Sequence, residues 1–240
     1  MKICDLHAHV LPGVDDGAQS MAQALQMLEN AVASDVTHLM VTPHFIPCHD
    51  SAQALTARLD RSFLALKEAS SHLPIQLALG AEVRVTPELL DNLSAEKIPT
   101  LNGSRYLLTE FPVDFQESAF PAVLEKLLDR GYIPLIAHPE RYNAVCRQPD
   151  MVRAWLDMGC HLQLTGGSIQ GNYGKTIQQT ALFLLHQDYV ACVASDAHGV
   201  HSRTNYLLDV YDHLTVHYSS QYAQYMMYTN PLRIWQDKSL

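Results

Sequence analysis

Short apolar segments alternate with longer amphipathic stretches along most of the chain. The apolar segments are rich in β-branched residues and have the length of buried strands. We place these strands at residues 3–8, 37–42, 75–81, 105–109, 133–137, 161–165 and 190–195. Apolar residues recur at helical spacing in the stretches 20–34, 51–72, 117–130 and 175–187. The pattern therefore predicts strands and helices in alternation.

Local signals mark several helix ends in this pattern. Ser20 and Gln23 have the spacing of a capping box at the start of the first helix. Thr86 followed by Pro87 predicts a further helix start, and Gly131 predicts the end of the helix at 117–130. The tail from residue 203 on predicts two helices, followed by Asn230-Pro231 and a short end.

The order of these elements predicts one domain built on one parallel sheet. Seven strand–helix units without a long linker, a repeat or a low-complexity tract are typical of one parallel, barrel-like sheet. The length of 240 residues suits one domain of this α/β type, spanning 1–240. Four tyrosines in the tail, whose spacing favours a packed helix face over a set of phosphorylation sites, are Tyr218, Tyr222, Tyr225 and Tyr228.

Histidines and carboxylates follow six of the seven predicted strands. In chain order they are His7 and His9, Asp15 and Asp16 in the next loop, His44, Glu82, Glu110, His138, and Asp196 with His198. The sixth strand ends instead in the small residues 165–168, which predict a turn that lets backbone approach a ligand. Because active sites of parallel barrels lie at the carboxyl ends of the strands, these groups should meet in one pocket.

Such a pocket is costly to form unless its polar groups are satisfied. One histidine or carboxylate alone is more often a hydrogen-bonded or surface residue, but the joint pattern indicates bound metal ions. Imidazoles and carboxylates without thiolates suit Zn²⁺, Mn²⁺ or Fe²⁺ better than Mg²⁺ or Ca²⁺. Five imidazoles and about four carboxylates give about nine ligands, which suffice for two or three ions, and three divalent ions against four carboxylates leave a charge of about +2 that favours a phosphate dianion.

Composition and missing motifs exclude several other classes. The chain carries 25 acidic against 16 basic residues, a net charge of −9, so nucleic acid is not an expected partner. We expect no signal peptide, because the N-terminus becomes polar at Asp5 and His7, and no membrane span, because no apolar run approaches roughly 18 residues. The five cysteines are scattered without a C-x-x-C pair, which favours reduced thiols. Reduced cysteines favour a cytoplasmic protein. The spacings C-x5-R and G-x-S-x-G of thiol and serine nucleophiles are absent.

With these residues in place, the chain resembles the PHP (polymerase and histidinol phosphatase) superfamily. The similarity rests on Asp5-Leu-His7-Ala-His9, Thr-Pro-His44, Glu82, His138 and Ser-Asp196-Ala-His198, in this order. Three further motifs resemble the CpsB/YwqE-type tyrosine-protein phosphatases of capsule and exopolysaccharide systems. They are Leu11-Pro-Gly-Val-Asp-Asp-Gly17, His138-Pro-Glu-Arg-Tyr142 and Gly167-Ser-Ile-Gln-Gly-Asn-Tyr-Gly174.

This resemblance implies a distorted seven-stranded (β/α)7 PHP barrel with three divalent metal ions, Mn²⁺ foremost, with Fe²⁺ and Zn²⁺ open. The first ion is expected on His7, His9, Glu82 and Asp196. Glu82 would bridge to a second ion that is completed by Glu110 and His138. The third is expected on Asp16, rather than Asp15, with His44 and His198. Arg141 and Arg203 match the family's phosphate-binding arginines.

The implied reaction is hydrolysis of phosphotyrosine by a hydroxide that bridges two metal ions. The implied substrate is a phosphotyrosine protein, namely the tyrosine-rich tail of a bacterial tyrosine kinase that regulates capsule or exopolysaccharide synthesis. Two alternatives remain at this point. One is a phosphatase of histidinol phosphate or another small molecule, and the other is a non-catalytic scaffold of polysaccharide export. The sequence leaves the native metal, the general acid and the oligomeric state open.

Overall fold

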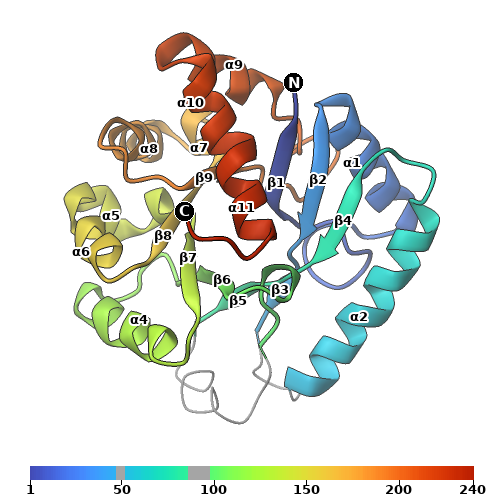
Figure 1. Cartoon of the computed structure of the whole chain (residues 1–240), viewed down its shortest axis with the longest axis horizontal. Coiled ribbons are helices and arrows are strands. Elements are labelled where there is room, and N and C mark those ends of the chain that lie inside the picture. Colours follow the sequence, from blue (N-terminus) through green and yellow to red (C-terminus); the bar gives the residue numbers. More distant parts are fainter. Residues whose placement is uncertain (47–51, 86–97) are drawn as a thin grey trace.

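Parallel β-sheet forms the centre of the molecule (Figure 1). The computed structural model describes residues 1–46, 52–85 and 98–240. Within these ranges the strands are β1 (Ile3–Ala8), β2 (Val36–Val41), β3 (His44–Phe45), β4 (Gln76–Leu79), β5 (Glu82–Arg84), β6 (Tyr106–Glu110), β7 (Ile133–Ala137), β8 (His161–Thr165) and β9 (Cys192–Ala194). They form a three-stranded sheet, β1-β2-β4, and a six-stranded sheet, β3-β5-β6-β7-β8-β9.

The predicted α/β class with parallel strands is confirmed, whereas the single seven-stranded sheet is not observed. Two breaks divide the strands: Thr42-Pro43 separates β2 from β3, and Gly80-Ala81 separates β4 from β5. Proline has no N–H for a strand ladder, which explains why the ladder stops at Pro43. Two backbone hydrogen bonds still cross this level, from Gly80 N–H to Val41 and from Glu82 N–H to Pro43.

The two sheets also meet at the other edge of β1. An isolated parallel bridge joins Ala8 to Ala197, just beyond β9. Beside it, the Asp196 N–H donates to the His7 carbonyl at 2.8 Å, and the His9 N–H donates to the Ala197 carbonyl at 2.8 Å. The first and last strands are therefore neighbours, and this contact brings the first and last site motifs together.

Helices surround the strands, with α1 and α2 on one side and α4 to α8 on the other (Figure 1). Their bounds are α1 (Met21–Ala33), α2 (Ala52–Ala69), α4 (Phe120–Leu128), α5 (Asn143–Arg147), α6 (Val152–Asp157), α7 (Gly166–Gln170), α8 (Lys175–His186), α9 (Leu208–His217), α10 (Ser220–Gln224) and α11 (Asn230–Trp235). The four predicted amphipathic stretches are confirmed as α1, α2, α4 and α8. The short helices α5 and α6 were not predicted, since neither is long enough to show helical periodicity.

The predicted helix ends are mostly confirmed. Ser20 caps α1, because its hydroxyl accepts a hydrogen bond from the Gln23 N–H at 3.2 Å. The return bond differs from a standard capping box, since the Gln23 side chain accepts from the N–H of Gln19 rather than of Ser20. Gly131 has the left-handed φ of 82° expected after a helix. The start predicted at Thr86-Pro87 lies outside the described residues.

The strand residues divide into two apolar cores. Residues of β6 and β7 alternate: Tyr106, Leu108 and Leu135 pack in one cluster, whereas Leu107 and Ile136 pack with the helices. The first cluster fills the space enclosed by the strands, and its members include Cys4, Leu6, Met40, Ala137, Cys192 and Ile234. The enclosed core thus takes its last member from the C-terminal helix.

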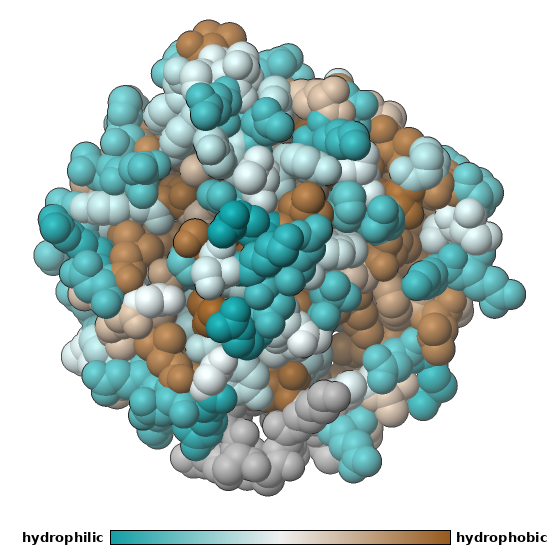
Figure 2. Space-filling model, viewed as in Figure 1, coloured by the Kyte–Doolittle hydropathy of each residue, from teal (hydrophilic) through white to brown (hydrophobic). Residues whose placement is uncertain are grey.

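Helix α11 closes the amino end of the strands, and it lies in front of them in Figure 1. Asn102 donates a side-chain hydrogen bond to the Trp235 carbonyl, and the Tyr106 hydroxyl donates to the Lys238 carbonyl at 2.9 Å. Hydrophilic side chains cover the middle of this face (Figure 2). The amphipathic tail therefore covers the amino ends of the strands and leaves their carboxyl ends for a functional site.

The prediction for the tail was wrong at Asn230-Pro231. Instead of ending before this pair, the second helix continues through a π-helical turn, Tyr225–Thr229, into α11. Pro231 stands in the first turn of α11, where no backbone N–H is needed. Of the four tail tyrosines, Tyr218, Tyr222 and Tyr228 pack against the cores, as predicted, while Tyr225 is 45% exposed.

The small residues after β8 form a helix rather than the predicted turn. Helix α7 begins at Gly166, where a Cβ would lie 2.9 Å from a methyl carbon of Val210 in α9. Glycine is therefore required here for the close contact between two helices. No helix among the described residues combines the length and the apolar character needed to cross a membrane.

Tyr142 joins the ends of two strands. Its side chain is buried, and its hydroxyl donates to the Ala137 carbonyl at 2.8 Å and accepts from the Phe111 N–H at 3.1 Å. We expect Tyr142→Phe to lower the free energy of unfolding by about 1–3 kcal/mol, because two buried backbone groups lose their partner. Urea unfolding measures this loss.

The matched control is Tyr225→Phe, which removes a hydroxyl from an exposed ring. It should change the free energy of unfolding by less than about 0.5 kcal/mol. Equal effects of the two substitutions would contradict the structural role of the Tyr142 hydroxyl.

Candidate metal centre and active site

All nine predicted metal ligands lie at or after the carboxyl ends of β1, β2, β4, β6, β7 and β9. His7 is in β1, His44 begins β3, Glu82 begins β5, and Glu110 ends β6. The others stand in the connections that follow β1, β7 and β9: His9, Asp16, His138, Asp196 and His198. Most of these side chains are buried, and Asp16, at 62% exposure, marks the solvent side of the cluster.

The group expected to hold the first ion is compact. His7 Nε2 and His9 Nε2 are 3.1 Å apart and lie 3.4 and 3.3 Å from Oε2 of Glu82. Oδ1 of Asp196 lies 3.4 Å from His7 Nε2 and 3.6 Å from His9 Nε2. Ligand atoms at about 2.1 Å from one ion are separated by about 3.0–3.4 Å, so these spacings fit a shared metal ion.

Glu82 links this group to the next. Its Oε1 lies 2.7 Å from His138 Nε2, and its Oε2 lies 2.9 Å from His44 Nδ1. Glu110 is placed beside them, with Oε2 at 3.9 Å from His44 Nδ1. The geometry therefore groups His44 with Glu82 and Glu110, in addition to the expected contact of Glu82 with His138.

The third group surrounds the exposed Asp16. Its Oδ1 lies 3.3 Å from His44 Nε2 and 3.3 Å from His198 Nε2. His9 also belongs to this group, and its ring stacks on that of His198 with centroids 3.8 Å apart. His44 thus stands between the second and third groups, and the assignment of each residue to one ion stays a prediction.

The cluster has the hydrogen-bonding pattern of a metal site. Glu110 Oε2, Asp196 Oδ1 and His198 Nε2 are buried and have no hydrogen-bond partner among the described residues. Buried polar atoms are nearly always paired, and all three of these atoms face the other ligands. Divalent cations would satisfy them, so the residues present fit the metal ions that the sequence predicts.

Two residues hold imidazole rings from behind. Oδ2 of Asp15 lies 2.8 Å from His9 Nδ1, and Oε1 of Gln163 lies 2.8 Å from His7 Nδ1. Both oxygens can only accept, so each Nδ1 carries the proton and each Nε2 is free to bind a metal ion. Asp15 also accepts from the N–H groups of Gly17 and His44. Asp15 is therefore placed to orient ligands, while Asp16 faces them directly.

Asp5 and Ser195 fix the strand ends that carry the ligands. The buried Asp5 carboxylate accepts from the Ser195 hydroxyl at 2.6 Å and from the N–H groups of Ser195 and His7. Glu140 is also buried, and its carboxylate accepts from the Thr165 N–H at 3.0 Å. No role was predicted for Asp5, Glu140 or Gln163. Asp5 and Glu140 stand inside motifs, whereas nothing local marks Gln163 in β8.

Both predicted phosphate-binding arginines converge on Asp196. Arg141 Nη1 and Arg203 Nη2 donate to the same Oδ2 atom, at 2.7 and 2.9 Å. The Arg141 guanidinium also lies over the ring of Tyr173, 5.0 Å from its centroid. Two guanidinium groups thus border the carboxylate-histidine cluster on one side, where a phosphate could be bound.

Three residues of the site have unusual backbone conformations. His138, Asp196 and Arg203 have positive φ values of 36°, 52° and 47°. None of them is glycine, so each conformation stores strain that the surrounding hydrogen bonds must hold. Such strain concentrates where side chains are aimed at a ligand, which agrees with the position of these residues.

Burial and pairing shift the pKa values of the central carboxylates. Burial raises the pKa of Glu82, but the charge of His7 and the hydrogen bond from His138 outweigh it and bring the pKa well below its usual range. Asp196 is affected in the same way: burial opposes its charge, and the positive charges of His7 and His138 lower its pKa. Both carboxylates are therefore ionised at neutral pH and available to cations.

Together, the parallel α/β fold and this cluster are those of a metal-dependent phosphohydrolase. The chain matches the family model described as capsular polysaccharide synthesis, CpsB/CapC, over residues 3–236. It belongs to this family.

Curated relatives and a solved structure support this family membership. The tyrosine-protein phosphatase YwqE of Bacillus subtilis is 31% identical over 199 residues, which cover 83% of this chain and 78% of YwqE. The tyrosine-protein phosphatase CpsB of Streptococcus pneumoniae is 30% identical over 241 residues, covering 98% of each chain. A crystal structure from work on YwqE and CpsB, described as metal-dependent tyrosine phosphatases, matches at 28% identity with a TM-score of 0.89, covering 99% of this chain and 96% of the other.

A more distant structure shows likeness of fold alone. The phosphotriesterase homology protein of Escherichia coli matches with a TM-score of 0.61 at 11% identity, over 98% of each chain. The fold thus extends to proteins with little sequence in common with this one.

In the absence of metal ions, His9 is protonated near neutral pH. Burial lowers its pKa, but hydrogen bonds to Asp15 and Glu82 outweigh this effect and raise the pKa to about 10. An imidazole must be neutral to bind a metal ion, so binding should release protons. We expect the affinity for Mn²⁺ to rise between pH 6 and 8, by up to about tenfold per pH unit for each proton released.

Isothermal titration calorimetry in buffers of different ionisation enthalpy measures the number of protons released. An affinity that is independent of pH, without proton release, would contradict this charge state of the cluster.

Proposed function

We propose that the chain is a metal-dependent tyrosine-protein phosphatase of a capsule or exopolysaccharide system. The observation that carries this proposal is the joint geometry of the site: the nine predicted ligands meet at one end of the strands, and two arginines donate to the same oxygen of Asp196. The similarity to proteins named tyrosine-protein phosphatases supports phosphotyrosine in a protein as the substrate.

The proposed site holds three divalent ions, with Mn²⁺ foremost. His7, His9, Glu82 and Asp196 would hold the first ion, with Glu82 shared by the second. Glu110 and His138 would complete the second site, and Asp16, His44 and His198 would hold the third. When bound, such ions lower the pKa of water and polarise phosphoryl oxygens.

The protein's own residues bind and orient the phosphoryl group. The guanidinium groups of Arg141 and Arg203 donate to one carboxylate oxygen, and this direction suits them to phosphoryl oxygens that arrive beside Asp196. Asp15 and Gln163 keep the rings of His9 and His7 in one orientation. Phenolate, with a pKa of about 10, leaves readily, so a strong general acid is less necessary than for an alkyl phosphate.

We further propose that the physiological substrate is the tyrosine-rich tail of a bacterial tyrosine kinase in the cytoplasm. The support is the family's description as capsular polysaccharide synthesis together with the tyrosine-phosphatase names of its curated members. A small-molecule phosphatase and a scaffold without activity are the outcomes that the following experiments distinguish from this proposal.

The first experiment compares a phosphotyrosine peptide with histidinol phosphate in the presence of Mn²⁺. We expect hydrolysis of the peptide with the higher kcat/KM, and loss of activity with a chelator or in His7→Ala, because His7 lies within 3.4 Å of three other predicted ligands. Release of inorganic phosphate is the readout. Preference for histidinol phosphate would assign the site to a small-molecule substrate.

The second experiment removes the phosphate-binding charge without touching the metal ligands. We expect Arg141→Ala or Arg203→Ala to lower kcat by about 10²-fold or more, with metal content unchanged. Each substitution removes a guanidinium that would donate hydrogen bonds to the negative phosphoryl oxygens in the transition state. The matched control is Arg105→Ala, whose partner Asp237 lies at the opposite end of the strands. Full activity of both active-site variants would point away from phosphoryl transfer at this site.

A further inference from the structure

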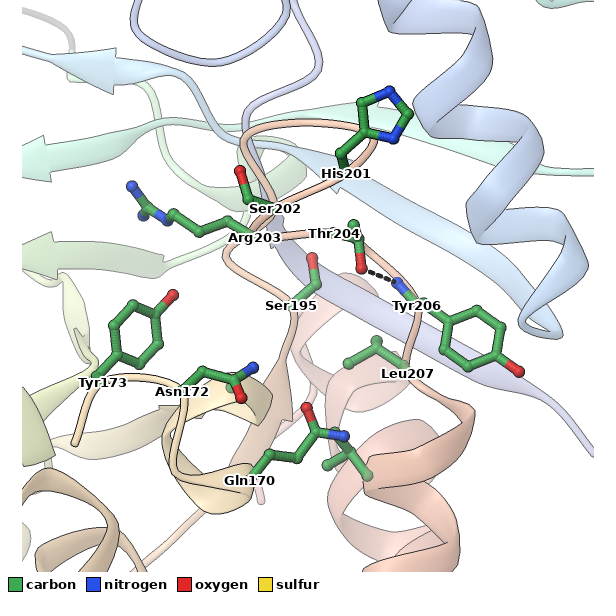
Figure 3. A pocket seen from close by; sticks show the side chains of 12 residues that line it. Gln170, Asn172, Tyr173, Ser195, His201, Ser202, Arg203, Thr204, Tyr206 and Leu207 are labelled. Atoms are coloured by element: carbon green, nitrogen blue, oxygen red, sulfur yellow. Dashed lines mark hydrogen bonds between the residues drawn. The ribbon is translucent and has the colours of Figure 1, made fainter. Parts of the chain in front are cut away.

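A cavity of about 340 Å³ opens beside the metal cluster (Figure 3). Two segments enclose it: residues 167–173 after β8, and residues 201–210 leading into α9. Ser195 and Arg203 connect it to the active site, because Ser195 precedes Asp196 and Arg203 donates to Asp196 at 2.9 Å. A ligand anchored by its phosphate between the arginines could therefore extend directly into this space.

One wall of the cavity presents two free carboxamides. The side chains of Gln170 and Asn172 are exposed, and neither makes a hydrogen bond within the described part of the chain. Figure 3 shows both amide ends directed toward the middle of the lining residues, facing Ser195. A carboxamide both donates and accepts, which matches the N–H and C=O groups of a peptide main chain.

The segment that carries these amides is held rigidly. Helix α7 ends at Gly171 in the left-handed conformation, with φ of 86°, and the Asn172 N–H donates back to the Gly167 carbonyl at 2.9 Å. A Cβ at position 167 would lie 3.1 Å from the Tyr173 ring and 3.4 Å from the Asn172 side chain, so glycine lets the segment fold back tightly. The motif Gly167–Gly174 thus forms one wall of the cavity and supplies none of the predicted metal ligands.

The second segment lines the cavity with both polar and apolar groups. Its polar members are His201, Ser202, Arg203 and Thr204, whereas Leu207 and Val210 are buried and the ring of Tyr206 is 45% exposed. Amides and apolar groups that line one cavity suit a short extended peptide, whose main chain would meet the amides and one of whose side chains would meet the apolar groups. Free inorganic phosphate or a small alcohol phosphate would leave these groups unused.

We propose that this cavity is a peptide subsite, in which Gln170 and Asn172 bind the main chain of the residues that flank the phosphotyrosine. This inference rests on the proposed function and deepens it. Because main-chain groups are common to all peptides, the subsite distinguishes a protein substrate from a free phosphate ester and accepts varied sequences.

The test uses the full chain with Mn²⁺ and two probes, a phosphotyrosine peptide and free O-phosphotyrosine. We expect the double variant Gln170→Ala with Asn172→Ala to lower kcat/KM for the peptide by about tenfold or more, mainly through KM, since two hydrogen bonds are lost. The value for free O-phosphotyrosine should change by less than about twofold, because that probe does not reach the amides. Gln179→Ala, an exposed glutamine of α8 outside the cavity, is the matched control.

The possible outcomes distinguish failure of the proposed phosphatase function from failure of the peptide subsite. A wild-type protein that hydrolyses neither probe would overturn the proposed phosphatase function itself. An active wild type whose double variant loses the same factor on both probes, or on neither, would overturn the peptide subsite alone. A loss confined to the peptide supports it.

Discussion

The carboxylate of Glu82 is the constraint on which the rest of the site depends. It is buried, with 1% exposure, at the start of β5, and four imidazoles surround it: His138 at 2.7 Å, His44 at 2.9 Å, His9 at 3.3 Å and His7 at 3.4 Å. A buried charge is tolerated only when it is compensated. The histidines that compensate it come from three different strands or strand ends, so the position of one carboxylate ties the two sheets to a single centre.

The two ends of the strands carry separate tasks. At the amino end, Ile234 of α11 enters the apolar core enclosed by the strands, and hydrogen bonds from Asn102 and Tyr106 fasten the tail. At the carboxyl end, polar and strained residues gather, which alone would destabilise the fold. Three of these residues have positive φ values, so burial of apolar side chains elsewhere, including the core closed by α11, must stabilise the fold against this strain.

Glycine and amide residues shape the approach to the centre. Close contact between α7 and α9 at Gly166, and the tight fold of the segment after Gly167, place the cavity directly beside Arg203. Binding energy from flanking residues can be used only when the reacting group is already positioned, which is the role that the proposed function gives to the arginines on Asp196. The proposed phosphate site and the cavity share Arg203, so they are adjacent parts of one surface.

The sequence by itself determined seven of the strand positions, the parallel α/β class and the gathering of histidines and carboxylates at one end of the strands, because periodicity and the polar residue after most strands are local signals. Tertiary structure alone decided the rest. The division of the strands into two sheets, the helix at Gly166 and the hydrogen bond from His7 to Gln163, 156 residues away, depend on which segments become neighbours. No local pattern in the sequence singles out Gln163. An amide inside a strand can orient a histidine ring only after folding brings the two into hydrogen-bond contact.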